Sequence, residues 1–130
     1  MIILDSDHWV ALLRGRLDLR GRVTPGEELA MTAVSLAELS HGARKSARAS
    51  DNLARLDVLT ALTAVLPFDE AAARRFGALK AELEQAGAAL SDLDLQIASI
   101  ALARQCVLVS HNRRHFDRVP ELVVEDWLSP

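Results

Sequence analysis

The first seven residues constrain the fold of this chain more than any other stretch. Ile2, Ile3 and Leu4 form an apolar run without polar alternation, which is typical of a short strand buried on both faces of a parallel sheet. Two carboxylates, Asp5 and Asp7, follow at once, and an apolar helical segment begins after them. The working crevice of an open α/β sheet lies at the carboxyl ends of its strands. We therefore expect Asp5 at that crevice, although Asp and Ser are also common helix caps.

Apolar strands and amphipathic helices alternate along the rest of the chain. Ser35 and Glu38 have the Ser-x-x-Glu spacing of a capping box, so we expect a helix to begin there and to run to about Gly42. The alternation predicts an α/β fold, a three-layer α/β/α sandwich with a mostly parallel sheet of about five strands, in a single domain over residues 1–130. The expected strands are 2–4, 29–34, 64–68, 106–110 and, at an edge, 122–125, and the further helices are 51–63, 70–86 and 92–103, capped in the last two cases by Asp69 and Ser91.

The composition of the chain excludes several classes of protein. No apolar run approaches the roughly 20 residues that cross a membrane, and the chain starts without the basic region of a signal peptide, so we expect a cytoplasmic protein. The single cysteine, Cys106, allows no internal disulfide and, with four scattered histidines, argues against structural zinc; we expect it in the core. The net charge of −3 gives no overall basic surface for nucleic acid.

Four polar positions fall at equivalent places in the pattern, at the ends of strands or near the starts of the helices that follow. They are Asp5, Glu38, Asp94 and the segment 110–112. These places share one edge of a parallel sheet, so the groups can converge in one crevice. Carboxylates without clustered sulfur or imidazole suit a hard cation such as Mg²⁺ or Mn²⁺, which removes their mutual repulsion and serves phosphodiester cleavage. A role in capping the start of a helix would still explain Glu38 or Asp94 if each were considered alone.

The helix expected over residues 92–103 gives its two early aspartates different directions. Asp94 precedes Ile97 and Ala101 by three and seven residues, and this stripe is wholly apolar. Asp92 lies on a face of the helix that mixes polar and apolar residues. We therefore expect Asp94 to point over the strand ends towards Asp5, and Asp92 to point outward.

Seven short stretches follow one another in an order and spacing that are specific only when taken together. They are ILDSD (3–7), SLAELSHG (35–42), VLPFD (65–69), DLDLQIA (92–98), SHNRRHF (110–116), RVPEL (118–122) and EDW (125–127). With them the chain resembles a PIN-domain ribonuclease, specifically a VapC-type toxin of a toxin–antitoxin pair. The resemblance covers essentially the whole chain.

The resemblance implies a catalytic and metal-binding site made of Asp5, Glu38 and Asp94. Asp5 and Asp94 would hold Mg²⁺ (or Mn²⁺), and Glu38 would bind it through water or help to deprotonate the nucleophile. The fourth acidic position of the family falls on Asn112, and Asp7 stands where the family usually has asparagine. Three residues are therefore expected to support the site: Ser6, Asp7 and Asn112.

The resemblance also implies a biological role, with other roles left open. It implies metal-dependent cleavage of RNA by the toxin of a type II toxin–antitoxin pair, a homodimer, and a VapB-like antitoxin whose tail covers the site. Arg113 and Arg114 are expected to contact the RNA backbone. The alternatives are a catalytically idle PIN-fold module for protein interactions, a phospho-acceptor α/β domain, and a DNA-directed nuclease. The phospho-acceptor class needs a lysine on a late strand, and residues 106–110 contain none.

Overall fold

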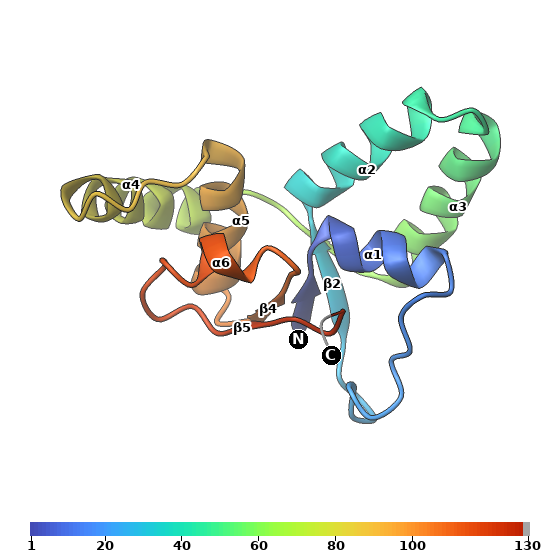
Figure 1. Ribbon diagram of the computed structural model, residues 1–130, viewed down its shortest axis with the longest axis horizontal. Helices are drawn as coiled ribbons and strands as arrows, with labels where there is room; N and C mark the ends of the chain where they lie inside the picture. Colours follow the sequence, from blue (N-terminus) through green and yellow to red (C-terminus); the bar gives the residue numbers. More distant parts are fainter. Residues whose placement is uncertain (129–130) are drawn as a thin grey trace.

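A parallel sheet of five strands forms the middle layer of the computed structural model, which describes residues 1–128 (Figure 1). The strands are β1 (Ile2–Leu4), β2 (Leu29–Thr32), β3 (Ala64–Leu66), β4 (Val107–Val109) and β5 (Val124–Glu125). Their order across the sheet is β3-β2-β1-β4-β5, and every neighbouring pair is parallel. The predicted α/β class is confirmed, with a sheet that is parallel throughout and with β5 at an edge.

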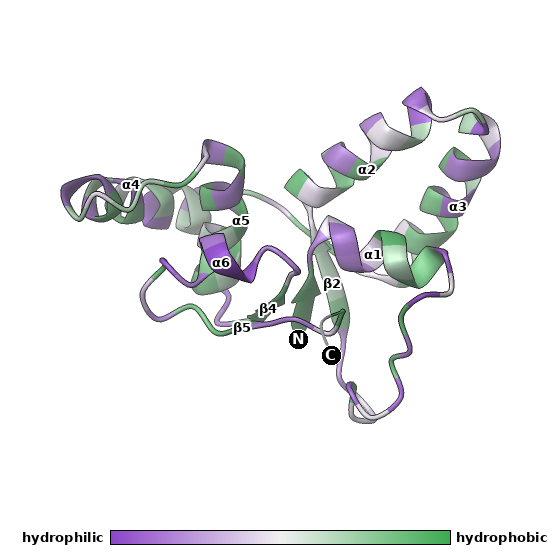
Figure 2. Ribbon diagram, in the orientation of Figure 1, coloured by the Kyte–Doolittle hydropathy of each residue, from purple (hydrophilic) through white to green (hydrophobic). Residues whose placement is uncertain are grey.

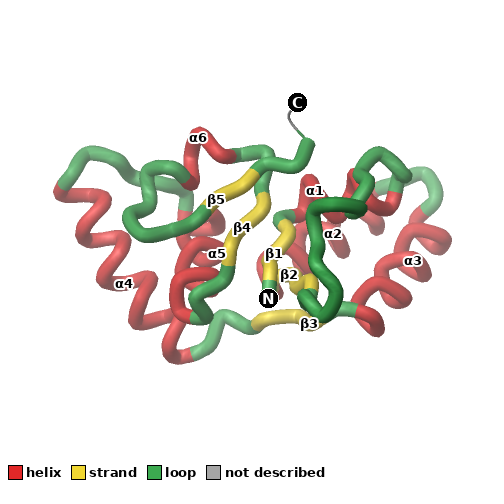
Figure 3. Tube along the Cα trace, turned by 90° about the horizontal axis from the view of Figure 1, so that it is seen from below, coloured by secondary structure: helices red, strands yellow, loops and turns green. Residues whose placement is uncertain are grey.

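Helices lie on both sides of this sheet, because parallel strands need long crossover connections. One side carries α1 (Ser6–Leu13), α2 (Ala33–Lys45) and α3 (Ala49–Leu62), and the other carries α4 (Glu70–Gln85), α5 (Asp92–Ala103) and α6 (Arg113–Phe116) (Figures 1 and 3). The views show the predicted three layers. No helix within residues 1–128 is long and apolar enough to span a membrane.

The central strand packs against a different hydrophobic core on each face. Ile3 is fully buried in one core, together with Leu79 of α4 and Ile100 of α5. Its neighbour Leu4 is equally buried in the other core, beside Trp9 of α1. The strand is therefore apolar on both faces, as its unbroken hydrophobic run predicts, and Figure 2 shows β1 and β4 in the colour of hydrophobic residues.

The junction between β2 and α2 lies earlier in the chain than the sequence predicts. β2 ends at Thr32, and Thr32 is the N-cap of α2, with its Oγ1 accepting a 3.0 Å hydrogen bond from the backbone N–H of Ser35. The capping box expected from Ser35 and Glu38 is therefore wrong. Threonine is common both in strands and at helix N-caps. The apolar run that continues past Thr32 therefore looked like one longer strand in the sequence. Glu38 consequently has no capping role.

Other helix ends follow the prediction more closely. The Asp69 carboxylate caps α4 by accepting from the N–H of Ala72 at 3.0 Å, and the Ser91 hydroxyl caps α5 by accepting from the N–H of Asp94 at 3.2 Å. Cys106 is a buried core residue as expected, and burial raises the pKa of its thiol. The short helix α6 was not expected. Its single turn is too brief to produce a hydrophobic period.

Candidate active site

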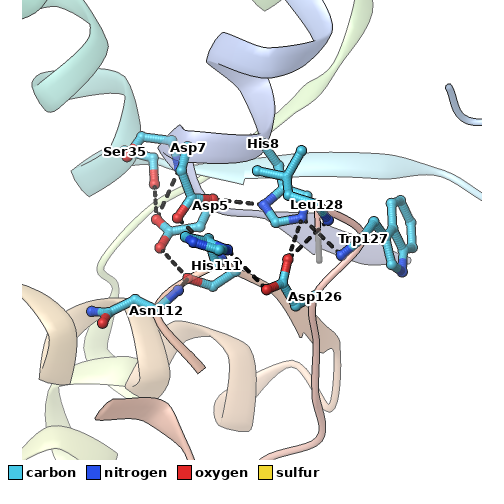
Figure 4. A network of polar contacts seen from close by, with 11 residues as sticks. Asp5, Asp7, His8, Ser35, His111, Asn112, Asp126, Trp127 and Leu128 are labelled. Carbon is cyan, nitrogen blue, oxygen red and sulfur yellow. Dashed lines mark hydrogen bonds and ion pairs between the residues drawn. The ribbon is translucent and has the colours of Figure 1, made fainter. Parts of the chain in front are cut away.

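Asp5 lies at the carboxyl end of the central strand, and only 7% of its surface is exposed. It is the N-cap of α1, and its Oδ1 accepts a 2.9 Å hydrogen bond from the N–H of Ser6. Two buried hydroxyls also donate to it: Ser35 Oγ to Oδ1 at 3.3 Å (Figure 4), and Ser110 Oγ to Oδ2 at 2.8 Å. Ser110 follows β4 and Ser35 lies in the first turn of α2. Groups from three parts of the chain therefore fix this one carboxylate.

The electrostatics of the site are dominated by negative charge. Burial raises the pKa of Asp5 above its ordinary value, the charge of Asp7 raises it further, and the surrounding hydrogen bonds partly oppose the shift. Partial burial likewise raises the pKa of Glu38 on α2, followed by the charges of Asp5, Asp94 and Asp7. No positive side chain is among the groups that shift either pKa. Glu38 thus lies within electrostatic reach of three other acids, Asp5, Asp7 and Asp94.

Helix α5 turns its two early aspartates in different directions. The side chain of Asp94 is 21% exposed, and its Oδ2 lies 3.5 Å from Nδ1 of His115 on α6. Asp92 is 62% exposed and forms a 2.9 Å ion pair with Lys80 of α4. Asp94 raises the pKa of Glu38, whereas Asp92 is not among the charges that do so. Asp92 therefore points outward as the helix phase predicts, and Asp94 is the less exposed of the two aspartates.

Asp7 contacts histidines and is not the cap of α1 (Figure 4). Its Oδ1 lies 2.6 Å from Nδ1 of the fully buried His8, and its Oδ2 accepts a 3.1 Å hydrogen bond from the N–H of His111. The backbone N–H of Trp127 donates to Nε2 of His8 at 3.1 Å, so Nε2 carries no proton. With Nε2 as an acceptor, Nδ1 is the ring atom that faces the Asp7 carboxylate as a donor. This arrangement connects the chain around Trp127 to the acidic edge.

The other expected supporting residues follow β4. The backbone N–H of Asn112 donates to Ser110 Oγ at 3.0 Å, and its side-chain Nδ2 lies 3.0 Å from Nδ1 of His115. Asn112 thereby links the hydroxyl that binds Asp5 to the imidazole beside Asp94. Arg113 and Arg114 are exposed on α6.

The acids suit a hard cation by chemical type. Carboxylates without thiolates form the donor set that Mg²⁺ and Mn²⁺ prefer. A cation would also relieve the repulsion that adds to the effect of burial on the pKa of Asp5 and Glu38. Within residues 1–128, however, no three acid, imidazole or thiol groups are close enough together to ligate one ion. For these three carboxylates to share one ion, the partly exposed side chains of Glu38 and Asp94 would have to turn towards the buried Asp5.

Sequence reasoning missed several groups that hold these acids. Ser35 was assigned to a cap, and its contact with Asp5 depends on the true start of α2 three residues earlier. His8 was not selected, although it shares an apolar face of its helix with Leu12, and a polar residue on such a face is the one signal that could have found it. The contact of His8 with Trp127, 119 residues away, has no signal in the sequence.

Comparison with known proteins gives consistent matches over most of the chain. The PIN domain family model matches residues 2–122. Ribonuclease VapC2 of Rickettsia felis is 35% identical over 99 residues, which cover 76% of this chain and 74% of the relative. The tRNA(fMet)-specific endonuclease VapC of Shigella flexneri is 37% identical over 100 residues, covering 77% and 76%. The crystal structure of VapBC2 from Rickettsia felis, bound to a DNA fragment from their promoter, includes a chain that matches with a TM-score of 0.87 at 30% identity, covering 98% of this chain and 99% of that one.

Proposed function

The chain belongs to the PIN-domain family, among the VapC ribonucleases of toxin–antitoxin systems, and from that premise we propose that it cleaves RNA with a divalent cation held by Asp5, Glu38 and Asp94. The carrying observation is the gathering of these acids at one edge of the sheet, where Asp5 and Asp94 both raise the pKa of Glu38. Each acid comes from a different element: the end of β1, α2 and α5.

The three acids have distinct parts in this proposal. Bound Mg²⁺ or Mn²⁺ lowers the pKa of a water and neutralises charge on the phosphodiester. Asp5, fixed by its hydrogen bonds, and Asp94, at the start of a buried helix, would hold the cation. The raised pKa of Glu38 makes its carboxylate a better proton acceptor for the attacking water. Ser6 and Asn112 support the site through the backbone and hydroxyl contacts around Asp5.

Partners follow from the same premise. A VapB-like antitoxin would bind this chain and cover the acidic edge, and the chain would act as a homodimer in the cytoplasm. Arg113 and Arg114, exposed on α6, would contact the RNA backbone near Asp94. Asp7 replaces the usual asparagine, and its bonds to His8 and His111 suit a group that adds charge beside Asp5.

Expression of the free protein tests this function in cells. Production of the chain alone should arrest growth, and co-production of its antitoxin should restore growth. The Asp94→Asn variant should be harmless at the same protein level, which controls for a burden from expression itself.

A cleavage assay then separates RNA from other substrates. The purified protein should cut RNA with Mn²⁺ and leave it intact with EDTA, and DNA of the same sequence should remain uncut. Intact RNA after prolonged incubation with Mn²⁺, over a panel of structured transcripts, would identify an idle interaction module. Cleavage of the DNA alone would identify a DNA-directed nuclease.

A further inference from the structure

A cavity of about 450 Å³ opens beside the acidic edge, between α1, α2 and α3. Ser6 and Glu38 line it where it meets the candidate active site, and Arg14 and Arg55 also line it. Arg14 directly follows α1, so it lies about 12 Å along the helix axis from Ser6. The cavity is therefore long enough to lead away from the acids towards two guanidinium groups.

We propose that this cavity is the subsite for a nucleotide of the RNA adjacent to the bond that is cleaved. The inference rests on the proposed ribonuclease function and names where the substrate lies. Sequence-specific recognition of RNA uses splayed bases placed against side chains, and a walled cavity next to the cleavage site can hold one. Part of the wall is apolar, and Val10, Leu39 and Leu56 in that part are available to the faces of a base.

The charges of the cavity favour a nucleic acid as its occupant. An RNA strand that crosses a cluster of carboxylates is repelled, so positive groups are needed where the strand leaves. Arg14 and Arg55 are exposed, and within residues 1–128 neither forms an ion pair. Arg48, near Arg55 in the chain, is by contrast paired with Asp51 at 2.8 Å. The two guanidinium groups are thus free to bind phosphate.

The cavity also has groups that can read the edge of a base. Asn52 on α3 lines it and donates from Nδ2 to Ser46 Oγ at 2.9 Å. That bond fixes the amide, and the Oδ1 of Asn52 remains an acceptor for an exocyclic amine. Apolar walls, a fixed amide and two arginines together fit a nucleotide better than a purely apolar ligand.

Gly42 provides a direct test, because it lines the cavity from α2 and a Cβ added there meets no atom within 4 Å. Gly42→Leu has open space at its Cβ, so it should narrow the cavity, and it should not weaken the helix, since glycine is a poor helix former. Gly77 on α4, across the sheet, is equally open and lies outside the residues that line the cavity, so Gly77→Leu is the matched control. We expect Gly42→Leu to raise the KM for RNA about tenfold, and Gly77→Leu to leave it unchanged.

Arg55→Gln tests the same cavity through its charge, independently of packing. Arg74→Gln on α4 removes the same charge far from the cavity and is its control. In EDTA, where RNA stays intact, Arg55→Gln should weaken binding of a fluorescent RNA oligonucleotide by about fivefold. It should also reduce the slope of log affinity against log salt by about 0.7, the value for one lost phosphate contact on a single strand.

Each outcome of these experiments decides a different point. If Gly42→Leu and Arg55→Gln bind and cleave RNA like the wild-type protein, the cavity is not a substrate subsite. If Gly42→Leu cleaves RNA normally but no longer binds the antitoxin, the cavity is a protein-docking groove and the inference is overturned. If the wild-type protein cleaves no RNA, the proposed function fails, while binding of RNA in EDTA still decides the role of the cavity.

Discussion

The hydroxyl of Ser110 donates a 2.8 Å hydrogen bond to Oδ2 of Asp5, although 105 positions separate the two residues in the chain. The parallel register of β1 and β4 pairs Leu4 with Val109, so the residues that follow these strands are neighbours. The bond lowers the pKa of Asp5, against the effect of burial. The order of strands in the sheet therefore sets the environment of the buried acid.

Removing this hydroxyl should destabilise the protein. Ser110→Ala deprives Asp5 of a buried donor and the N–H of Asn112 of its acceptor, so we expect a loss of about 1–3 kcal/mol in the free energy of unfolding. Urea denaturation measures it. Ser50→Ala on the exposed face of α3 is the control and should change stability by less than about 0.5 kcal/mol. Equal stability of both variants would mean that the bond to Asp5 contributes nothing.

The raised pKa values predict how stability depends on pH without metal. An acid that holds its proton more tightly in the folded protein makes the folded state bind more protons, so its contribution to stability falls as pH rises. For Glu38 the fall begins near the ordinary value of 4.5 and continues through the higher folded pKa. In EDTA, wild type should therefore lose stability relative to Glu38→Gln as pH rises from 4 towards 7.

The comparison of wild type with Glu38→Gln cancels the other titrating groups. Because Glu38 is partly exposed, we expect the difference between the two proteins to change by less than about 1 kcal/mol. Glu82→Gln on the exposed face of α4 should show no such trend. A difference that grows in favour of the wild type with rising pH would contradict the charge cluster.

Most of the fold could be predicted because hydrophobic periodicity reports it directly. The unbroken run Ile2–Leu4 indicated a strand buried on both faces, and the cap residues Asp69 and Ser91 marked two helix starts. The predicted boundary between β2 and α2 was wrong because Thr32 both ends the strand and caps the helix. Short elements such as α6 carry too few residues for a period to be visible.

The candidate site was predictable only in part, for a different physical reason. Acids at strand ends are visible in sequence because the topology of a parallel sheet brings those ends together. Hydroxyl and imidazole partners such as Ser35 and His8 depend on the exact rotation of each helix and on contacts between distant segments. These rotations and contacts are set by tertiary packing, which the local pattern of apolar and polar residues does not encode.

Addition of a divalent cation should stabilise the folded protein. A ligand that binds only the folded state raises the midpoint of unfolding by mass action, and here it also relieves the repulsion around Glu38. We expect millimolar Mn²⁺ to raise the thermal midpoint of wild type by several degrees, and about half as much in Glu38→Gln. Calorimetry with Mn²⁺ and with EDTA measures both. An identical midpoint with and without Mn²⁺ would remove the metal site.

Asp94 and Asp92 lie two residues apart on α5 and should differ sharply in their importance for cleavage. Asp94 faces the acidic edge and acts on Glu38, whereas Asp92 is exposed and paired with Lys80. Asp94→Asn removes a preorganised charge and should lower the rate of RNA cleavage by about 100-fold or more. Asp92→Asn should lower it by only a few-fold.

The pair forms its own control, because both changes remove one carboxylate from the first turn of the same helix and preserve the side-chain volume. Each variant is assayed at saturating Mn²⁺ after circular dichroism has shown that it is folded. Both carboxylates interact favourably with the helix dipole. Both variants should therefore lose a similar, small amount of stability, about 0.3–1 kcal/mol. Only the catalytic rate should separate them. An inactive Asp92→Asn beside an active Asp94→Asn would mean that α5 presents its other face to the substrate, and the proposed metal site would be wrong.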